Sequence, residues 1–454
     1  MIPAQEVVER VLAESKADET IVIVSDESEA SLRWAGNSMT TNGVSSSRSW
    51  TVVSIVRDGS ASHVGSVSSS SVDPDEITDV VAASAAAARS APPANDAMPL
   101  LGGGGDPDDW GDASEGTDIG VFAGLARDLA GGFDGADRLY GFAHHQVDST
   151  WLATSAGIRR RFVQPTGSVE INGKRGADAS AWVGAGTRHF ADVDVPEMLA
   201  ELSTRLDWAA TRVDLPAGRY ETLLPPSTVA DLMIYLAWTM EGRGAQEGHT
   251  AFSRAGGTRI GEKLTDLPLT LYSAPDAPDL ACAPFVATGA SSDSISIFDN
   301  GMPIERTDWI HEGTINALAY PRAAAQEFSE TPAVLADNLL LAGGSDATIS
   351  DMVAKTERGL LLTTLWYIRE VDPATLLLTG LTRDGVYLVE DGAVTGAVNN
   401  FRFNESPIDL LRRVAEAGAT ERTLPREWKD WFTRTAMPPM RIPDFHMSSV
   451  SQAN

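Results

Sequence analysis

The sequence predicts an α+β protein with an N-terminal mixed α/β region and a β-rich C-terminal domain. Three observations support this fold class. The chain has 454 residues, which is too long for one ordinary hydrophobic core. Segments with helical spacing of apolar residues alternate with β-branched runs in the first half. Short strand candidates separated by Asp-Gly turns dominate the second half.

The first 90 residues are expected to form an N-terminal α/β segment, 1–90. Val7, Val8 and Val11 recur at helical spacing, and a β-branched run follows them. Asp58-Gly59 is typical of a tight hairpin turn. We therefore expect helices at 3–17 and 73–88 and strands at 20–24, 30–34, 50–56 and 63–67.

Residues 91–118 are expected to form an acidic Gly/Pro linker or loop, because no basic residue lies between Arg89 and Arg127. The glycine run 102–105 could approach a phosphate closely, but the carboxylates that follow it would repel an anion.

A second α/β segment is expected over 119–220, with helices at 121–130 and 195–211 and strands at 138–144, 151–154, 158–163 and 179–184.

Residues 221–454 are expected to form the β-rich C-terminal domain, which begins close to Pro225-Pro226. Asp384-Gly385 and Asp391-Gly392 are turn signals between short apolar runs. Strands are expected at 294–298, 360–367, 376–383, 385–390 and 397–403, and a helix at 408–417.

Charge and composition exclude several classes of function. The chain has 63 acidic and 35 basic residues and a formal net charge of -28, which repels nucleic acid backbones and anionic membrane surfaces. It has no run of about 18 apolar residues and no signal peptide pattern. Cys282 is the only cysteine, which fits a reducing compartment. We therefore expect a cytoplasmic protein with neither nucleic acid nor membrane as a partner.

One helix in the C-terminal half runs into a glycine-rich stretch. Ser227 can cap this helix, and its apolar residues fall on one face: Val229, Leu232, Met233, Leu236 and Met240. The stretch that follows reads Met240-Glu241-Gly242-Arg243-Gly244-Ala245. Its glycines weaken the helix and allow another group to approach the backbone closely.

This stretch resembles the zinc motif of the TldD/PmbA family, the two related subunits of a cytoplasmic metallopeptidase. In TldD, the catalytic member, the pattern is H-E-x-x-x-H with a glycine before the second histidine. Glu241 and Gly244 match this pattern, whereas Met240 and Ala245 stand at the positions of the two histidines. The cysteine ligand that the family carries late in the chain is also missing, since no cysteine follows Cys282.

These replacements remove the chemistry that zinc requires. A catalytic zinc site needs about three His, Cys or carboxylate ligands and a bound water. A thioether is a poor zinc ligand, a methyl group is none, and Glu241 has no zinc-bound water to deprotonate. We therefore predict no catalytic residue, no metal ligand and no cofactor in this chain. A relocated site would have to use His144, His145, His189, His249, His311 or His446, with Glu247 or Glu312.

Residues 377–411 and the tail 437–454 also resemble this family, and the tail is similar to that of its PmbA (TldE)-type members. The resemblance implies a metal-free partner subunit of a TldD-type zinc metallopeptidase, in a heterodimer or higher heteromer. Zinc is then expected in the catalytic partner, and unfolded peptides are the substrate for proteolysis or peptide maturation. A homologue without a catalytic site can retain the family's interface and gate access to the partner's site.

Two stretches are candidates for contact with a peptide or a partner. Phe401, Arg402, Phe403, Asn404 and Glu405 either form a wall or interface or are ordinary alternating strand residues. Residues 427–432 either form an aromatic groove or, as we expect, a helix that packs Trp428, Trp431 and Phe432 on the core. Two other functions stay open, namely a self-sufficient peptidase with a relocated site and a homodimeric peptide-binding protein without catalysis.

Overall fold

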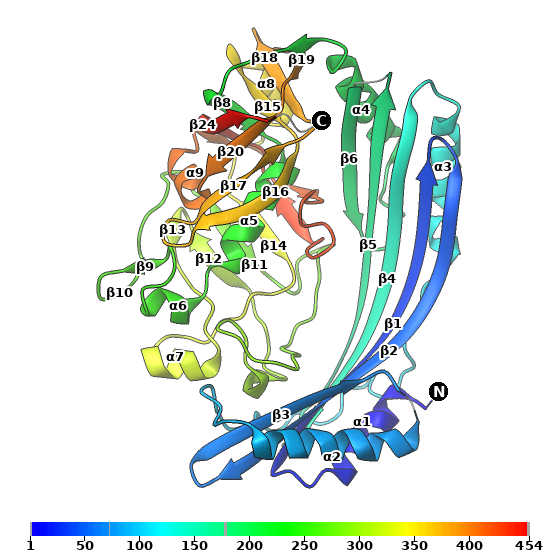
Figure 1. The fold of residues 1–454 in the computed structure, drawn as a ribbon, viewed down its shortest axis with the longest axis vertical. Helices are drawn as coiled ribbons and strands as arrows, with labels where there is room; N and C mark the ends of the chain where they lie inside the picture. The colour runs from blue at the N-terminus through cyan, green and yellow to red at the C-terminus, as the bar shows by residue number, and fades with distance from the viewer. Residues whose placement is uncertain (1, 72, 177–178, 452–454) are drawn as a thin grey trace.

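Two β-rich halves face each other in the computed structural model, which describes residues 2–71, 73–176 and 179–451 (Figure 1). A long curved sheet from the N-terminal half stands on one side, and the body of the C-terminal half stands on the other. This architecture confirms the predicted α+β class with its β-rich C-terminal domain. The last residues of the tail, 452–454, lie outside the described residues.

The N-terminal half is built on a six-stranded antiparallel sheet in the order β3-β2-β1-β4-β5-β6. Along β1, every even-numbered side chain from Thr20 to Trp34 is buried, and most of the residues between them are half-buried. One face of the sheet is therefore packed under helices, and the other faces the C-terminal half. That second face is apolar at one end, where Ile21 and Val53 pack with Phe298, and polar further along β1. The strands are β1 (Glu19–Ala35), β2 (Met39–Asp58), β3 (Ala61–Ser69), β4 (Arg138–Thr154), β5 (Arg159–Arg175) and β6 (Ala179–Thr187).

Four helices cover the buried face in two pairs. Val22, Val24 and Trp50 pack at the end that carries the first pair, and Leu32 and Trp34 pack at the end that carries the second. Between the two clusters, the buried guanidinium of Arg48 pairs with the carboxylate of Asp26. The first pair is α1 (Ala4–Glu14) and α2 (Pro74–Ser90), and the second is α3 (Ala123–Phe133), preceded by the 3-10 turn Ile119–Phe122, and α4 (Val195–Trp208).

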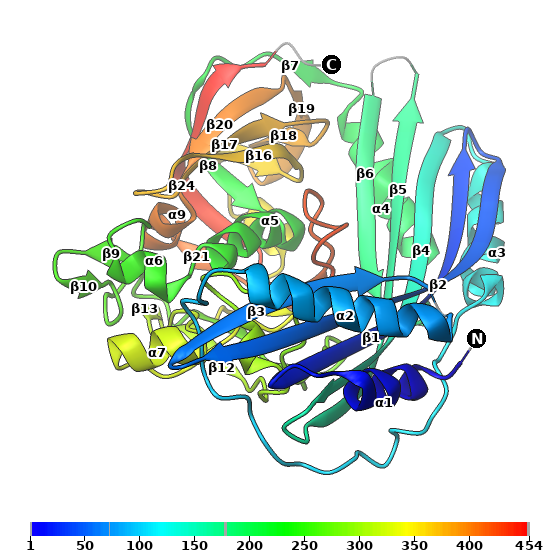
Figure 2. The ribbon, with the colours of Figure 1, turned by 60° about the horizontal axis from the view of Figure 1, so that its bottom comes forward.

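The acidic segment 91–118 winds around the sheet without helix or strand of its own (Figure 2). Met98 and Leu100 pack with Phe298 between the sheet and the C-terminal half. Trp110 packs in the cluster under α1 and α2, on the opposite face of the sheet. The segment therefore contacts both faces. Of the expected domains, 1–90 and 119–220 both contribute strands to the six-stranded sheet.

The C-terminal half contains a ten-stranded and a six-stranded sheet. The larger has the order β16-β17-β20-β24-β8-β15-β18-β19-β7, with β21 paired to β24, and the smaller has the order β13-β12-β11-β14-β23-β22. The first set is β7 (Arg212–Val213), β8 (Gly218–Leu224), β15 (Arg358–Leu362), β16 (Leu365–Asp372), β17 (Leu377–Thr382), β18 (Val386–Glu390), β19 (Ala393–Val398), β20 (Phe401–Glu405), β21 (Glu416–Ala417) and β24 (Met440–Val450). The second set is β11 (Thr270–Ser273), β12 (Thr307–His311), β13 (Thr314–Ile315), β14 (Leu339–Ala342), β22 (Glu421–Thr423) and β23 (Thr435–Met437), and β9 (Ser253–Arg254) and β10 (Gly257–Thr258) form a separate hairpin.

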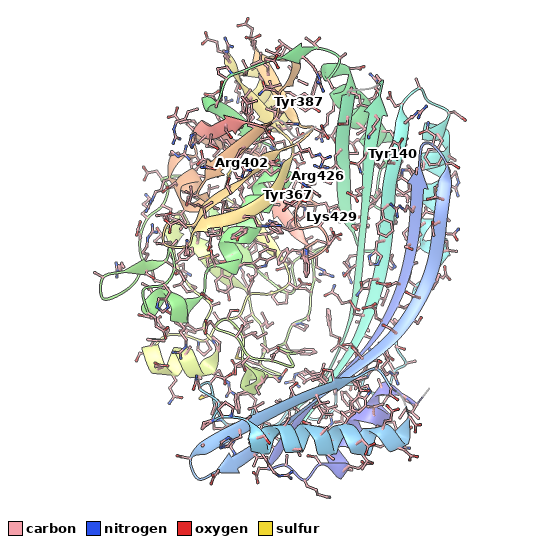
Figure 3. All side chains as sticks on the ribbon, viewed as in Figure 1. Tyr140, Tyr367, Tyr387, Arg402, Arg426 and Lys429 are labelled. Atoms are coloured by element: carbon pink, nitrogen blue, oxygen red, sulfur yellow. The ribbon has the colours of Figure 1, made fainter. Side chains whose placement is uncertain are left out.

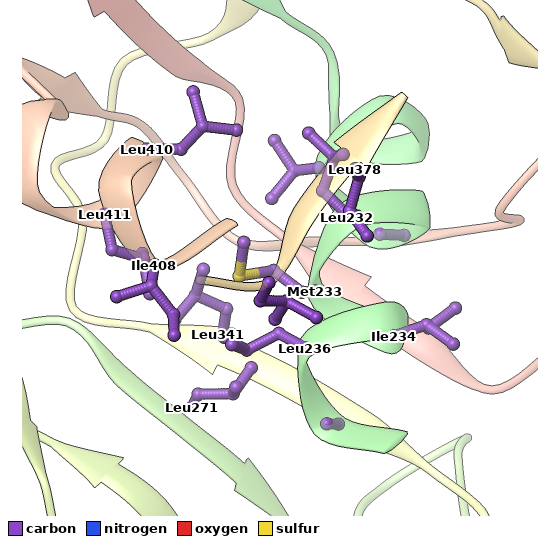
Figure 4. Close-up of a cluster of buried hydrophobic side chains, with 14 of the residues drawn as sticks. Leu232, Met233, Ile234, Leu236, Leu271, Leu341, Leu378, Ile408, Leu410 and Leu411 are labelled. Atoms are coloured by element: carbon purple, nitrogen blue, oxygen red, sulfur yellow. The ribbon is translucent and has the colours of Figure 1, made fainter. Parts of the chain in front are cut away.

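Helix α5 (Pro226–Trp238) lies in the core between these two sheets. Leu232, Met233 and Leu236 of α5 lie among leucines of β11, β14 and β17 and apolar residues of α9 (Figure 4). Because α5 is buried on nearly all sides, its position is fixed by packing. The remaining helices are α6 (Gly242–Gln246), α7 (Arg322–Phe328), α8 (Ile349–Ala354) and α9 (Pro407–Arg413), and a 3-10 turn spans Ile297–Asp299. None of the helices in the described ranges is long and apolar enough to cross a membrane.

Several predicted elements differ from the structure. The strand predicted at 294–298 is wrong, because this stretch is irregular and ends in the 3-10 turn. Residues 360–367 are divided between two strands, β15 and β16. Ser227 does not cap α5, because the helix begins at Pro226 after an N-cap at Pro225. The Asp391-Gly392 turn is confirmed, since both residues have positive φ and join β18 to β19.

Candidate functional site

The stretch that resembles the zinc motif lies where α5 ends. The helix stops at Trp238, and Glu241 has an extended backbone that forms the N-cap of α6. The amide of Ala319 donates to the carbonyl of Met240, and the amide of Gly242 donates to the carbonyl of Ala319, both at 2.8 Å. The motif therefore spans a helix break that is held by a neighbouring segment.

The two positions at which histidines would stand are filled by core side chains. Met240 is 1% exposed, Ala245 is 0% exposed, and both belong to the largest hydrophobic cluster. Burying a methionine side chain contributes about 1.5–3 kcal/mol to stability. These residues therefore stabilise the end of α5 by packing, and neither provides a ligand for zinc.

Close packing explains the glycines of the motif. A Cβ added at Gly242 would lie 2.2 Å from the ring of Tyr320, and one at Gly244 would lie 2.7 Å from a carboxylate oxygen of Glu241. Tyr320 is itself fixed, since it is 1% exposed and its hydroxyl accepts a hydrogen bond from Gln246 Nε2 at 3.2 Å. The predicted close approach to the glycine backbone is thus made by a tyrosine ring.

Replacing Gly242 with alanine is expected to lower the free energy of unfolding by about 1–3 kcal/mol, because the new methyl group displaces the buried ring of Tyr320. The matched control is Gly131→Ala in α3, where an added Cβ meets no atom within 4 Å. That change should stabilise the protein by about 0.5–1 kcal/mol. Urea denaturation of both variants measures the difference, and equal effects would contradict the packing explanation.

Glu241 is the one carboxylic acid in the stretch 240–245. Its pKa is raised first by burial and then by the charge of Asp293, while His249 lowers it. A cavity of about 400 Å³ lies beside α6 and is lined in part by Asp96 and Asp293. Arg243, which also lines it, is paired with Glu247 and Glu327 at 3.2 and 2.5 Å. Asp293 and His249 are therefore the charged neighbours that act on Glu241, with opposite effects on its pKa.

The donor set at this stretch does not fit zinc. Across the described ranges, no three His, Cys, Asp or Glu side chains gather closely enough to hold a metal ion. Cys282 is buried, and burial raises the pKa of its thiol to about 12, so it stays protonated. We accordingly assign no step to a metal in this chain.

The histidines considered for a relocated site are dispersed. Both ring nitrogens of the buried His145 are engaged, with Thr117 Oγ1 and the carbonyl of Arg188, at 2.7 Å each. The ring of His189 lies 6.0 Å from that of His145. The others have separate neighbours: His144 lies 3.4 Å from Glu29, His249 lies 3.6 Å from Glu247, His311 lies 3.0 Å from Asp308, and His446 is in β24.

The stretch 401–405 forms β20, an interior strand of the ten-stranded sheet. Phe401 and Phe403 are 0% exposed and belong to the core, and Glu405 is paired with Arg413. Arg402 is exposed and Asn404 is half-buried on the other face. A role of this strand as a wall or interface stays a prediction, and it can involve only these last two side chains directly.

The tryptophan-rich stretch forms turns, so the helix predicted at 427–432 is wrong. Trp428 packs on Tyr235 and Trp238 of α5, with ring centroids 5.7 and 5.1 Å apart. Phe432 is buried, but Trp431 is 78% exposed. Turn geometry allows the charged residues of this loop to reach the N-terminal sheet, where Lys429 lies 3.3 Å from Glu170.

A buried acid joins this loop to α5. Asp231 is 1% exposed, and its Oδ1 accepts a hydrogen bond from the amide of Glu427 at 2.9 Å. Its Oδ2 is buried without a partner among the described residues. Burial raises the pKa of Asp231 well above its usual range, and the charge of Glu427 raises it further, while the Glu427 amide and Arg426 lower it. The folded protein therefore favours the protonated acid.

This raised pKa predicts a pH-dependent stability. Because the folded state binds the proton of Asp231 more tightly than the unfolded state, stability should fall as pH rises from the unfolded pKa through the raised folded pKa. Asp231→Asn should remove this dependence and stabilise the protein more at pH 8 than at about pH 4. Asp79→Asn on the exposed face of α2 is the control for surface charge. Urea denaturation at both pH values should show the difference only for position 231, and parallel curves would contradict it.

Sequence reasoning missed a cavity of about 570 Å³ between the two halves. The N-terminal sheet contributes Tyr140, Lys174 and Trp182, and the C-terminal half contributes Trp366, Arg383 and Arg426. Figure 3 shows Arg426 and Lys429 on the C-terminal side of the space between the halves and Tyr140 on the sheet across it. The lining residues come from segments far apart in the chain, so only the cluster of charges and tryptophans after Leu424 could have indicated it.

The C-terminal half matches a known family model. Residues 217–449, more than half of the chain, match the model described as the PmbA/TldA metallopeptidase C-terminal domain. A comparison with curated proteins finds no match.

The fold is similar to that of three solved structures over nearly the whole chain. TldE from Thermococcus kodakarensis has a TM-score of 0.78 and 17% identity over 98% of this chain and 99% of that chain. A putative modulator of DNA gyrase from Bacteroides thetaiotaomicron has a TM-score of 0.78 and 15% identity, with 98% of both chains covered. A similarly described protein from Thermotoga maritima has a TM-score of 0.75 and 14% identity over 97% of this chain and 99% of that chain.

Proposed function

The chain belongs to the PmbA/TldD family of metallopeptidase-related proteins, and from this premise we propose that it is the metal-free partner subunit of a TldD-type zinc metallopeptidase. In this role it pairs with the catalytic chain and gates the entry of unfolded peptides to that chain's zinc site. The outcome is proteolysis or the maturation of a peptide.

The observation that carries this proposal is the pair of core residues at the ligand positions. Met240 and Ala245 are packed where the catalytic motif requires histidines, so the stretch contributes stability in place of metal binding. The fold is nevertheless retained over the full chain, as the similarity to a structure described as TldE supports. A homologue that keeps its fold and lacks the ligands is suited to pairing with a catalytic relative.

Features of the space between the halves support gating. The sheet face there is polar and carries Glu27, Glu29 and Gln146. Opposite it, β16 is an edge strand of the ten-stranded sheet, and Tyr367 and Val371 of that strand are 57% and 56% exposed. An edge strand can pair with the backbone of an extended chain irrespective of sequence. On β16 this pairing is restricted to residues other than Tyr367 and Ile368, whose amides donate to the carboxylate of Glu427 at 3.2 and 3.1 Å. An unfolded peptide fits this geometry better than a folded protein does.

Copurification from the native host tests the pairing. We expect the tagged chain to recover a homologue with an intact H-E-x-x-x-H motif in comparable amount. The mixture should cleave unfolded peptides but not folded proteins, and the isolated chain should cleave neither. A persistent homodimer without that homologue would support the homodimeric peptide-binding function instead. Peptide cleavage by the homogeneous chain would support the self-sufficient peptidase.

A further inference from the structure

Basic side chains converge on the 570 Å³ cavity although the protein is acidic overall. Lys174, Arg212, Arg383 and Arg426 line it, and Asp384 is the one acid among the described lining residues. Glu170, on the same sheet face, is engaged by Lys429 at 3.3 Å and by the indole of Trp182 at 3.0 Å. In a chain with a formal charge of -28, composition does not explain this local excess of positive charge.

Arg426 is a half-buried cation that forms no ion pair with any described residue. Its guanidinium carbon lies 5.4 Å from the ring centroid of Trp182 and 5.3 Å from that of Trp366. Its Nη1 is buried and has no hydrogen-bond partner in the described part of the chain. Burial lowers the pKa of Arg426, while the charges of Glu170, Asp231 and Asp384 oppose this effect. A desolvated cation without a partner is unfavourable, and an anion in the cavity would offset that cost.

Among the described residues that line this cavity or the adjoining one, the buried side-chain atoms without a hydrogen-bond partner can all donate hydrogen bonds. Trp366 Nε1 and Arg426 Nη1 belong to residues that line it, and the Tyr387 hydroxyl and Asn399 Nδ2 belong to residues that line an adjoining cavity of about 230 Å³. Asp384 lines both cavities, so the two cavities share part of their lining. An ionised carboxylate only accepts hydrogen bonds, so it complements such a surplus of donors.

We propose that this cavity binds a carboxylate carried by a peptide, either at its C-terminus or on an acidic side chain. The proposal rests on the proposed function in taking an unfolded peptide as the ligand. Trp366 belongs to the edge strand β16, so a chain that lies along β16 would reach the cavity. The indole rings of Trp182 and Trp366 hold the Arg426 guanidinium by cation–π contacts and limit its motion.

Binding of four probes to the purified full chain tests the proposal by isothermal titration calorimetry. The probes are an extended peptide with a free C-terminus and no acidic residue, its C-terminal amide, the same amide with one glutamate added, and inorganic phosphate. We expect the two peptides with a carboxylate to bind at least about tenfold more tightly than the plain amide, because each gains charge-assisted hydrogen bonds. Phosphate should bind more weakly than either.

Variants at Arg426 identify the cavity as the source of this preference. Arg426→Gln should reduce the preference for a carboxylate to within about twofold, and Arg426→Lys should retain part of it because the charge remains. Arg306→Gln is the matched control, since Arg306 stacks on Tyr272 at 3.9 Å, lies in a different cavity and pairs with Asp308 at 2.9 Å. It should leave the preference unchanged.

Three results would overturn the proposal: equal binding of the acid and amide peptides, an unchanged preference in Arg426→Gln, or phosphate binding as tight as peptide binding. If both peptides bind equally, peptide recognition survives and only the carboxylate site fails. The proposed function fails separately, when no catalytic homologue copurifies.

Discussion

Replacing Arg322 with methionine is expected to lower the free energy of unfolding by about 3–5 kcal/mol, because it leaves a buried carboxylate without its cation. Asp299 is 0% exposed and accepts hydrogen bonds from Nε and the backbone amide of Arg322, at 2.7 and 3.0 Å. Nη2 of Arg322 also donates to the carbonyl of Pro99 at 3.0 Å. This one side chain therefore joins α7, the 3-10 turn and the acidic segment beside the degenerate motif.

Equilibrium urea denaturation of the Arg322→Met variant gives this loss directly. Adding Asp299→Asn should restore part of the stability, since the second change removes the uncompensated charge. Arg10→Met is the surface control, because Arg10 and Glu6 form an exposed pair in α1, and its effect should stay within about 0.5 kcal/mol. Similar losses at positions 322 and 10 would show that burial does not strengthen the pair with Asp299.

The second large effect is expected for Phe403→Ala, which should lower the free energy of unfolding by about 3–5 kcal/mol. The ring of Phe403 is 0% exposed and its centroid lies 5.9 Å from that of Phe445. It also covers Gly380, where an added Cβ would lie 2.6 Å from the ring. Truncation therefore opens a cavity in the ten-stranded sheet that neighbouring side chains cannot fill without moving.

Arg402→Ala is the matched control in the same strand. Its side chain is exposed on the opposite face, so the stability change should stay within about 0.5 kcal/mol. If β20 also serves as an interface, Arg402→Ala weakens recovery of the catalytic homologue while the chain remains folded. A large stability loss at Arg402 and a small one at Phe403 would reverse our assignment of the two faces.

Elements with one apolar face could be predicted from the sequence, because their signal is local. The helix predicted at 73–88 is α2, and Asp73 caps it by accepting a hydrogen bond from the amide of Asp75. The turn predicted at Asp58-Gly59 joins β2 to β3, and Gly59 has a φ of +60°. Here the turn residues and the periodicity determine the structure without contacts from elsewhere.

The length of the sheet strands could not be predicted in the same way. β2 spans Met39–Asp58, but the prediction gave only 50–56, because residues 39–47 are exposed and include serine, threonine and glycine. β-propensity and apolar runs mark strands that are buried on a face. This part of β2 is stabilised by its ladder with β1, a pairing that no local pattern reveals.

At the candidate site, the sequence alone predicts the loss of the zinc ligands, but it does not predict where the side chains of the motif lie. The missing ligands follow from Met240 and Ala245 alone. That these side chains are packed in the core beside a helix break depends on Ala319 and Tyr320, which approach from about 80 residues further along the chain. The basic cavity likewise exists only because β5, β6 and the loop that carries Arg426 meet between the halves.

Zinc content and peptidase rate, measured on the purified chain alone and after mixing with the H-E-x-x-x-H homologue, test the central claim most directly. We predict substoichiometric zinc and no cleavage for the chain alone, and cleavage by the mixture that Glu241→Gln in this chain leaves unchanged. About one zinc per isolated chain, with cleavage that Glu241→Gln abolishes, would contradict a metal-free partner subunit.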